Sequence, residues 1–164
     1  MQDMYAEYMV KHKTGAKDLI FQFLIVFVAA VLVAGCIILV QGIGFLLAAL
    51  AVYGAYYLIS LKFLEYEYIF TNGEMDVDKI INRKKRERLI TVKSEEIERF
   101  SRYRPEEHIK GNYQTKIFAA ENDRSAENMC LVVNSRKKGK TLIVFTPNEK
   151  ISELIKSSAP RSVM

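Results

Sequence analysis

The chain has 164 residues, a formal net charge of +5 at pH 7 and two cysteines. This length leaves room for one small domain besides any membrane segment. Two cysteines, Cys36 and Cys130, are too few for the disulfide framework of a small secreted domain.

The N-terminal third of the chain contains a long uncharged run. No charged side chain occurs from Leu19 to Leu61, whereas about 20 apolar residues suffice for one membrane crossing. Two glycines in Gln41-Gly42-Ile43-Gly44 weaken a helix at the middle of this run and permit a turn. The sequence therefore predicts an integral membrane protein with a transmembrane hairpin at residues 19–61, its helices covering residues 19–40 and 45–61.

Positive charges flank the hairpin on both sides, whereas the connecting turn carries no charge. Lys11, Lys13 and Lys17 precede the first apolar segment, and Lys62 follows the second. Positively charged flanks stay on the cytoplasmic side of a membrane. We therefore expect a cell-membrane location with both termini in the cytoplasm.

A lipoprotein signal is an alternative interpretation of the first apolar segment. Val33-Ala34-Gly35-Cys36 resembles a bacterial lipobox, in which Cys36 would become the lipidated N-terminus. Apolar residues follow this cysteine, whereas small polar residues are usual there, and the segment is too long for a signal peptide core. A cysteine embedded in the membrane is the preferred interpretation.

The segment before the hairpin, residues 1–18, has an amphipathic pattern. Met1, Met4, Tyr5, Tyr8 and Met9 recur at the spacing of one helical face, and Gly15 could end the helix. The pattern predicts a cytoplasmic helix that lies on the inner leaflet or docks on the soluble domain.

After the hairpin the hydrophobic period changes from helical to two. Tyr66, Tyr68 and Phe70 share one face of a predicted strand at residues 65–71, with glutamates on the other face. Asn72-Gly73 is a strong hairpin signal because both residues tolerate positive φ. A returning strand from residue 74, a second turn at residues 82–86 and a third strand at residues 88–92 follow.

The rest of the chain reads as further strands and one terminal helix. A short helix or an irregular strand fits residues 94–97, a loop covers residues 105–114, and strands are expected at residues 115–120, 128–134 and 141–146. Pro147 opens a final helix with the apolar stripe Ile151, Leu154 and Ile155. Residues 62–164 are thus predicted to form a small antiparallel PH-like β-barrel with a C-terminal helix, in an α+β membrane protein.

These features resemble two groups of proteins. The strand and turn at residues 65–73, the strand through Ile80, the basic run at residues 83–88 and the terminal helix are similar to bacterial PH-like domains that follow transmembrane hairpins. The whole chain, including Val10-Lys11-His12-Lys13, resembles a family of small two-pass bacterial membrane proteins. The resemblance implies a fold and a topology, and no activity. The first hairpin turn, Asn72-Gly73-Glu74, lacks the basic residues with which eukaryotic PH domains grip phosphoinositides.

Catalytic and metal-binding motifs are not evident in the sequence. Glu106-Glu107-His108 lacks the second histidine of a helical zinc motif, and no Cys-x-x-Cys pair occurs. Gly139-Lys140-Thr141 matches the end of a phosphate-binding loop, but Asn134 stands where the first glycine is needed. We expect no enzyme, no metal and no cofactor.

One basic run carries the functional prediction. It consists of Arg83, Lys84, Lys85, Arg86 and Arg88. Near the inner face of a membrane each cation could contribute about 1 kcal/mol toward anionic lipid headgroups. A solvated turn is the simpler alternative. Nucleic acid is not expected as a partner because no aromatic residues interleave with the cations.

Two functions remain open from the sequence. The first is a membrane-anchored, non-catalytic PH-like interaction or scaffold module at the cytoplasmic face, alone or as a homo-oligomer. The alternative is an accessory subunit of a larger transporter or envelope membrane complex, whose hairpin packs against a membrane protein partner. Small residues in the apolar segments favour the second function. They are Gly35, Ala48, Ala51, Gly54 and Ala55.

Overall fold

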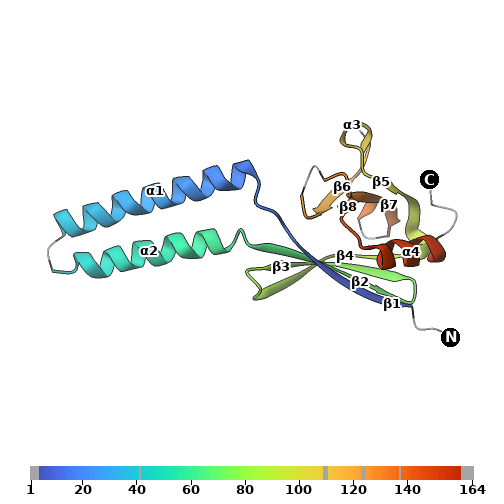
Figure 1. The fold of residues 1–164 in the computed structure, drawn as a ribbon, viewed down its shortest axis with the longest axis horizontal. Helices are drawn as coiled ribbons and strands as arrows, with labels where there is room; N and C mark the ends of the chain where they lie inside the picture. The colour runs from blue at the N-terminus through green and yellow to red at the C-terminus, as the bar shows by residue number, and fades with distance from the viewer. Residues whose placement is uncertain (1–3, 41, 109–110, 123–124, 137, 160–164) are drawn as a thin grey trace.

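A computed structural model describes residues 4–40, 42–108, 111–122, 125–136 and 138–159 (Figure 1). The elements in chain order are β1 (Tyr5–Lys11), α1 (Ala16–Leu39), α2 (Gly44–Ser60), β2 (Leu64–Thr71), β3 (Glu74–Ile81), β4 (Lys85–Lys93), η1 (Ser94–Glu96), β5 (Ile97–Arg102), α3 (Pro105–His108), β6 (Thr115–Ala119), β7 (Met129–Ser135), β8 (Gly139–Phe145) and α4 (Glu149–Ser158). The α+β class is confirmed: a helix pair near the N-terminus precedes most of the sheet structure and a C-terminal helix.

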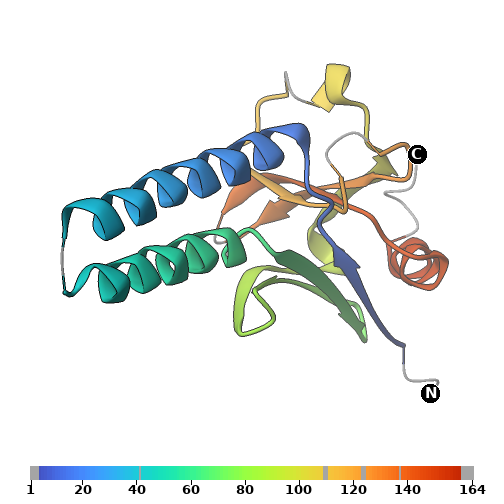
Figure 2. The same ribbon diagram turned by 60° about the vertical axis from the view of Figure 1, so that its left-hand side comes forward.

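The two long helices lie side by side and extend away from the sheets (Figures 1 and 2). Within the described residues, one helix is long and apolar enough to cross a membrane, namely α1 over residues 18–39 with a mean hydropathy of 2.8. α2 is equally apolar but has only 17 residues. The predicted helix boundaries agree with the structure to within a few residues.

Close packing between these helices depends on Gly44, which belongs to the predicted turn. A Cβ at Gly44 would overlap the backbone carbonyl of Cys36, so the first turn of α2 approaches α1 directly. Ala48 is also buried at this seam. In contrast, a Cβ at Gly35 or Gly54 would meet no atom within 4 Å. The small residues therefore do not all serve the contact between α1 and α2.

The N-terminal segment is a strand, so the helix expected for this segment is wrong. β1 pairs antiparallel with β2, from Tyr5 opposite Thr71 to Lys11 opposite Glu65. Ala6 and Val10 point into the core. The spacing of Met and Tyr residues fits a helix, but burial in the structure has the period of two of a strand: Ala6 and Val10 are buried, and Tyr8 between them packs against the core. The helix pair is thus inserted between two neighbouring strands of one sheet.

The first sheet has the order β1-β2-β3-β4, with antiparallel pairing throughout. Both predicted turns are present, but the second is shorter than expected. Asn72 and Gly73, with φ values of 46° and 88°, form a two-residue hairpin turn of the I′ type. The second turn covers residues 82–84, with φ values of 50° and 54° at its first two residues, because Ile81 pairs with Lys85. Residues 85 and 86, which were expected in this turn, therefore belong to β4.

The second sheet has the order β5-β7-β8-β6. β6, β7 and β8 agree with their predicted ranges to within two residues, whereas β5 was not predicted as a regular strand. The pairing differs from an all-antiparallel meander because β6 runs parallel to β8. The two four-stranded sheets enclose the main core, where the Tyr68 ring meets Phe145 edge-on at 5.4 Å. Ile151 and Ile155 of α4 are fully buried against this core.

Candidate interaction surface at the sheet and helix junction

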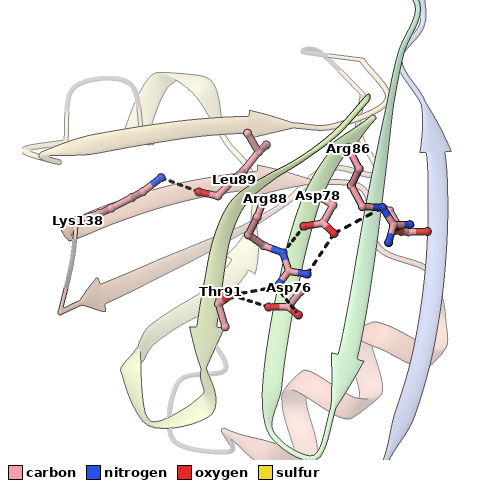
Figure 3. A network of polar contacts seen from close by, with 8 residues as sticks. Asp76, Asp78, Arg86, Arg88, Leu89, Thr91 and Lys138 are labelled. Atoms are coloured by element: carbon pink, nitrogen blue, oxygen red, sulfur yellow. Dashed lines mark hydrogen bonds and ion pairs between the residues drawn. The ribbon is translucent and has the colours of Figure 1, made fainter. Parts of the chain in front are cut away.

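Buried carboxylates lie on the face of the first sheet that points away from the main core. Glu67 on β2 and Asp78 on β3 are opposite one another in register, and each is only 1% exposed. Two buried carboxylates require positive partners because removing a charge from water is costly. Arg86 and Arg88 of β4 supply them (Figure 3).

The arginine contacts form one connected network (Figure 3). Arg88 makes a bidentate contact with Asp78 through Nε and Nη2, and Nη2 lies 3.2 Å from Asp78 Oδ2. The Nη1 atom of Arg88 lies 2.7 Å from Asp76 Oδ2. The Thr91 hydroxyl donates a hydrogen bond to Asp76 Oδ1 at 2.6 Å. Arg86 forms an ion pair with Glu67 and lies 3.9 Å from Asp78. The side chains of β4 therefore cover the middle of this face.

This environment shifts two pKa values in the network. The hydrogen bond to Asp78 raises the pKa of Arg88, which therefore stays charged. Burial raises the pKa of the Glu67 carboxyl; Arg86 opposes this shift and the nearby Glu7 carboxylate adds to it. The sequence shows glutamates on the polar face of β2 but gives no sign that this face is covered.

The five cations of the basic run separate into two groups. Arg83 forms an ion pair with Glu65 at 3.2 Å, and Arg86 and Arg88 belong to the network. Lys84 and Lys85 are exposed and form no ion pair with any residue that the structure describes. Three of the five predicted contact residues thus serve internal carboxylates, and the two lysines face outward.

The β3–β4 turn, which contains Lys84 and is followed by Lys85 at the start of β4, lies beside the end of the helix pair. The backbone amide of Asn82 donates to the carbonyl of Phe63 at 2.8 Å, and Leu64 is opposite Ile81. The second strand therefore returns to the helix ends, as the up-and-down order of the strands predicts.

A hollow of about 380 Å³ opens at this junction. Its lining combines the end of β1, the first turns of α1, the α2–β2 connection and the β3–β4 turn. The residues are Lys11, His12, Thr14, Gln22, Lys62, Phe63, Leu64, Glu65, Asn82 and Arg83. From the sequence, Lys11 and Lys62 were recognised only as positive charges that flank the hairpin and set its orientation. Because β1 pairs with β2, the two cationic flanks of the helices meet at one place.

A second hollow, of about 360 Å³, lies between β4 and the β7–β8 turn. The Lys138 ammonium reaches across it and donates to the backbone carbonyl of Leu89 at 2.6 Å (Figure 3). β4 is an edge strand of the first sheet, so this contact occupies one of its outward carbonyls. Such a lysine limits pairing with other chains.

The described residues do not assemble a reactive centre. His108 Nε2 lies 3.3 Å from the Cys130 sulfur, which also lies 3.3 Å from the Ser101 hydroxyl. However, Cys130 is fully buried and its burial raises the thiol pKa, which is opposite to the activation of a nucleophilic cysteine. In the described part of the chain, no group of three His, Cys, Asp or Glu side chains could hold a metal ion.

The β domain consists of two packed four-stranded sheets and one amphipathic C-terminal helix, and the helix pair is inserted between two strands of its first sheet. The chain belongs to the family described as Bacterial PH-like domain (DUF6106), whose family model matches residues 2–164. No curated protein and no solved structure matches the chain. The PH-like part of the resemblance is thereby confirmed.

Proposed function

We propose that this protein is a membrane-anchored, non-catalytic PH-like interaction module whose helix pair crosses the bilayer twice. The observation that carries the proposal is the apolar surface that stays exposed on the helices outside their contact with each other. No residue in the span over residues 18–39 is fully buried inside the structure. The exposed apolar side chains of the two helices include Phe23, Phe27 and Leu39 of α1 and Phe45 and Leu50 of α2. Water is a poor solvent for a surface of this kind, whereas lipid chains are a good one.

The lengths of the helices suit a hairpin in a bilayer. The 24 residues of α1 rise about 36 Å and the 17 residues of α2 about 25 Å, against a hydrocarbon core of roughly 30 Å. Ile43 and Leu61 at the two ends of α2 add apolar length. Small mismatches are accommodated by tilt or by local thinning of the bilayer.

The pairing of β1 with β2 constrains the topology. β1 precedes α1 and β2 follows α2, so the two flanks of the hairpin lie on the same side of any membrane. The cationic flanks favour the cytoplasmic side. We therefore place both termini and the PH-like domain in the cytoplasm.

Single-cysteine labelling tests this topology. In a background with Cys36→Ala and Cys130→Ser, one variant carries Ile43→Cys at the helix turn and the other Glu95→Cys in the PH-like domain. Both native side chains are exposed. An impermeant maleimide applied to intact cells should label the first variant only, and the second only after lysis. Labelling of the Glu95→Cys variant from outside, or release of the protein by alkaline carbonate, would overturn the proposal.

A second candidate function is that of an accessory subunit of a larger membrane complex. Gly35 and Gly54 favour it, because they leave open space on the helix surface that another helix could approach. Purification from native membranes in a mild detergent distinguishes the two functions. One stoichiometric membrane protein partner would support the accessory role, whereas recovery alone or as a homo-oligomer would support the first function.

A further inference from the structure

We propose that the protein binds one anionic phospholipid at the junction, with the phosphate in the basic hollow and one acyl chain in a groove between α1 and α2. This inference rests on the proposed membrane anchoring and adds a specific ligand to it. This site does not include Lys84 and Lys85, for which the sequence predicts lipid contact, nor the first hairpin turn at Asn72-Gly73.

The hollow has the charge of an anion site. Three of its side chains are cationic, namely Lys11, Lys62 and Arg83, and the single carboxylate is Glu65. Glu65 already accepts from Arg83 Nε at 3.2 Å. The Nη atoms of Arg83 form no hydrogen bond with any described residue, and the Arg83 side chain is 72% exposed. A guanidinium with an open edge is suited to a phosphate.

The other cations are also available to a ligand. Lys62 is held loosely, 3.7 Å from Asp18 and 4.7 Å above the Phe21 ring, and its side chain is 42% exposed. Lys11 is exposed at the end of β1 and has no ion pair among the described residues. The amides of Gln22 and Asn82 add neutral hydrogen-bond donors to the lining.

An apolar groove of about 370 Å³ runs along the helix pair. It is lined by Leu24, Ile25, Val28, Ala29, Leu32, Ala51, Gly54, Ala55 and Leu58. Every residue in this lining is apolar, and Gly54 leaves its floor open because no atom lies within 4 Å of a Cβ placed there. The shape and polarity suit a single hydrocarbon chain.

The hollow and the groove are neighbours along both helices. Gln22 of the hollow precedes Ile25 of the groove by three residues on one helical face, and Lys62 of the hollow follows Leu58 of the groove by four residues. At a rise of 1.5 Å per residue, the step on α1 is about 4.5 Å along the helix axis. In Figure 2 this is the end of the helix pair nearest the sheets.

A phospholipid is the occupant that matches both parts. Free phosphate would use only the hollow and leave the groove unoccupied. A second copy of the chain related by a two-fold axis would bring the same cations face to face, which is unfavourable. Basic pockets beside transmembrane helices on the cytoplasmic side are suited to anionic headgroups.

The experiment is native mass spectrometry of the full chain in a mild non-ionic detergent, titrated with phosphatidylglycerol or phosphatidylcholine of the same acyl chains. We expect one bound phosphatidylglycerol, at an affinity at least ten-fold above that of phosphatidylcholine. The variant Lys11→Gln/Lys62→Gln/Arg83→Gln should lose this preference. The variant Lys84→Gln/Lys85→Gln is the control and should keep it. If the triple variant is poorly folded, Lys11→Gln alone should lower the affinity about three-fold or more.

A pair of glycine variants tests the groove. Gly54→Leu places a side chain in the groove, whereas Gly35→Leu is the matched control, since Gly35 also has open space but does not line the groove. We expect Gly54→Leu to weaken phosphatidylglycerol binding ten-fold or more and Gly35→Leu to leave it within two-fold. Equal effects of the two variants would overturn the acyl-chain assignment.

Soluble competitors identify the source of the phosphate. Millimolar glycerol phosphate or inorganic phosphate should not displace the lipid. Displacement by either, or equal affinity for the two lipids, would overturn the proposal. Carbonate extraction of the same samples separates this result from the anchoring proposal: a protein that stays in the membrane but shows no lipid preference contradicts the phospholipid site alone.

Discussion

The backbone amide of His12 donates a hydrogen bond to the carbonyl of Leu64 at 2.9 Å, although 52 residues separate them. This bond continues the β1–β2 ladder to the point where the helix pair begins. The helices thus occupy the position of a hairpin loop. The PH-like domain consists of residues from both sides of the insertion.

Excision of the helices should leave a folded, soluble domain. Replacing residues 13–63 with Asn-Gly joins His12 to Leu64 by a two-residue hairpin turn. We expect a mainly β circular dichroism spectrum and a cooperative thermal transition. The fragment 62–164 is the comparison, and it should be much less stable because it lacks β1 and uncovers the β2 edge. Equal stability of the two proteins would contradict the role of β1.

The exposed lysines of the β3–β4 turn should contribute to vesicle binding by the excised domain. At about 1 kcal/mol for each cation, Lys84→Gln/Lys85→Gln should weaken binding to phosphatidylglycerol vesicles by about ten- to thirty-fold. Binding by the parent should fall as salt rises. Lys150→Gln/Lys156→Gln on α4 is the control, since α4 lies away from the helix junction in Figure 1. Equal losses in the two variants would indicate a general charge effect.

Tyr68 should be a strong determinant of stability. Its hydroxyl donates to the carbonyl of Ala119 and accepts from the amide of Thr146 at 3.3 Å, and its ring is fully buried. Tyr68→Phe removes this hydroxyl and leaves the Ala119 carbonyl and the Thr146 amide without its hydrogen bonds. We therefore expect a loss of about 1–3 kcal/mol in the free energy of unfolding. Denaturant titration measures it. Tyr5→Phe, at an exposed hydroxyl, should change stability by less than about 0.5 kcal/mol.

Arg86 should stabilise the fold in a pH-dependent way. Because the pKa of Glu67 is raised above its ordinary value of 4.5, the folded chain binds this proton more readily than the unfolded chain. The free energy of unfolding therefore falls as the pH rises through the Glu67 pKa. Arg86→Gln removes the charge that opposes this shift, so stability should fall by about 1–2 kcal/mol at neutral pH and by less under acidic conditions.

The control for this prediction is Lys85→Gln, which removes the same charge from a side chain without an ion pair among the described residues. Its stability should follow that of the parent within about 0.5 kcal/mol at every pH. A deficit in Arg86→Gln that does not shrink on acidification would show that Glu67 is not the group responsible.

Gly44 should be required for the helix contact. A Cβ there overlaps the carbonyl of Cys36, so Gly44→Ala should push the helices apart and cost about 1–3 kcal/mol. Gly35→Ala should be nearly neutral because the space beside Gly35 is open. Denaturant titration of the full chain in a mild detergent measures both. Similar losses in the two variants would contradict the contact.

Local patterns in the sequence were sufficient to predict most of the elements. The alternation at Tyr66, Tyr68 and Phe70 predicted β2, and the positive φ tolerated by Asn72 and Gly73 predicted its turn. β1 was missed because the spacing of Tyr5 and Met9 fits one face of a helix as well as the exposed face of a strand. Only the non-local pairing with β2 decides between these structures.

The candidate surface was less predictable because it depends on register. Asp78 lies opposite Arg88 in the β3–β4 pair, and this alignment converts part of the basic run into partners for buried carboxylates. Likewise, the parallel pairing of β6 with β8 is a contact between segments that the sequence does not mark as neighbours. The hollow at the junction unites Lys11 and Arg83 only through the β1–β2–β3 order.

With the membrane anchoring proposed above, the insertion of the helices between β1 and β2 would link folding to membrane integration. In a bilayer, β1 is synthesised first but has no partner until both helices have crossed and β2 has emerged on the same side. A chain whose second helix failed to insert would hold β1 and β2 on opposite sides, with the first sheet incomplete and Tyr68 without its core. Completion of this sheet thus acts as a check on topology, because only a correctly threaded chain can bury it.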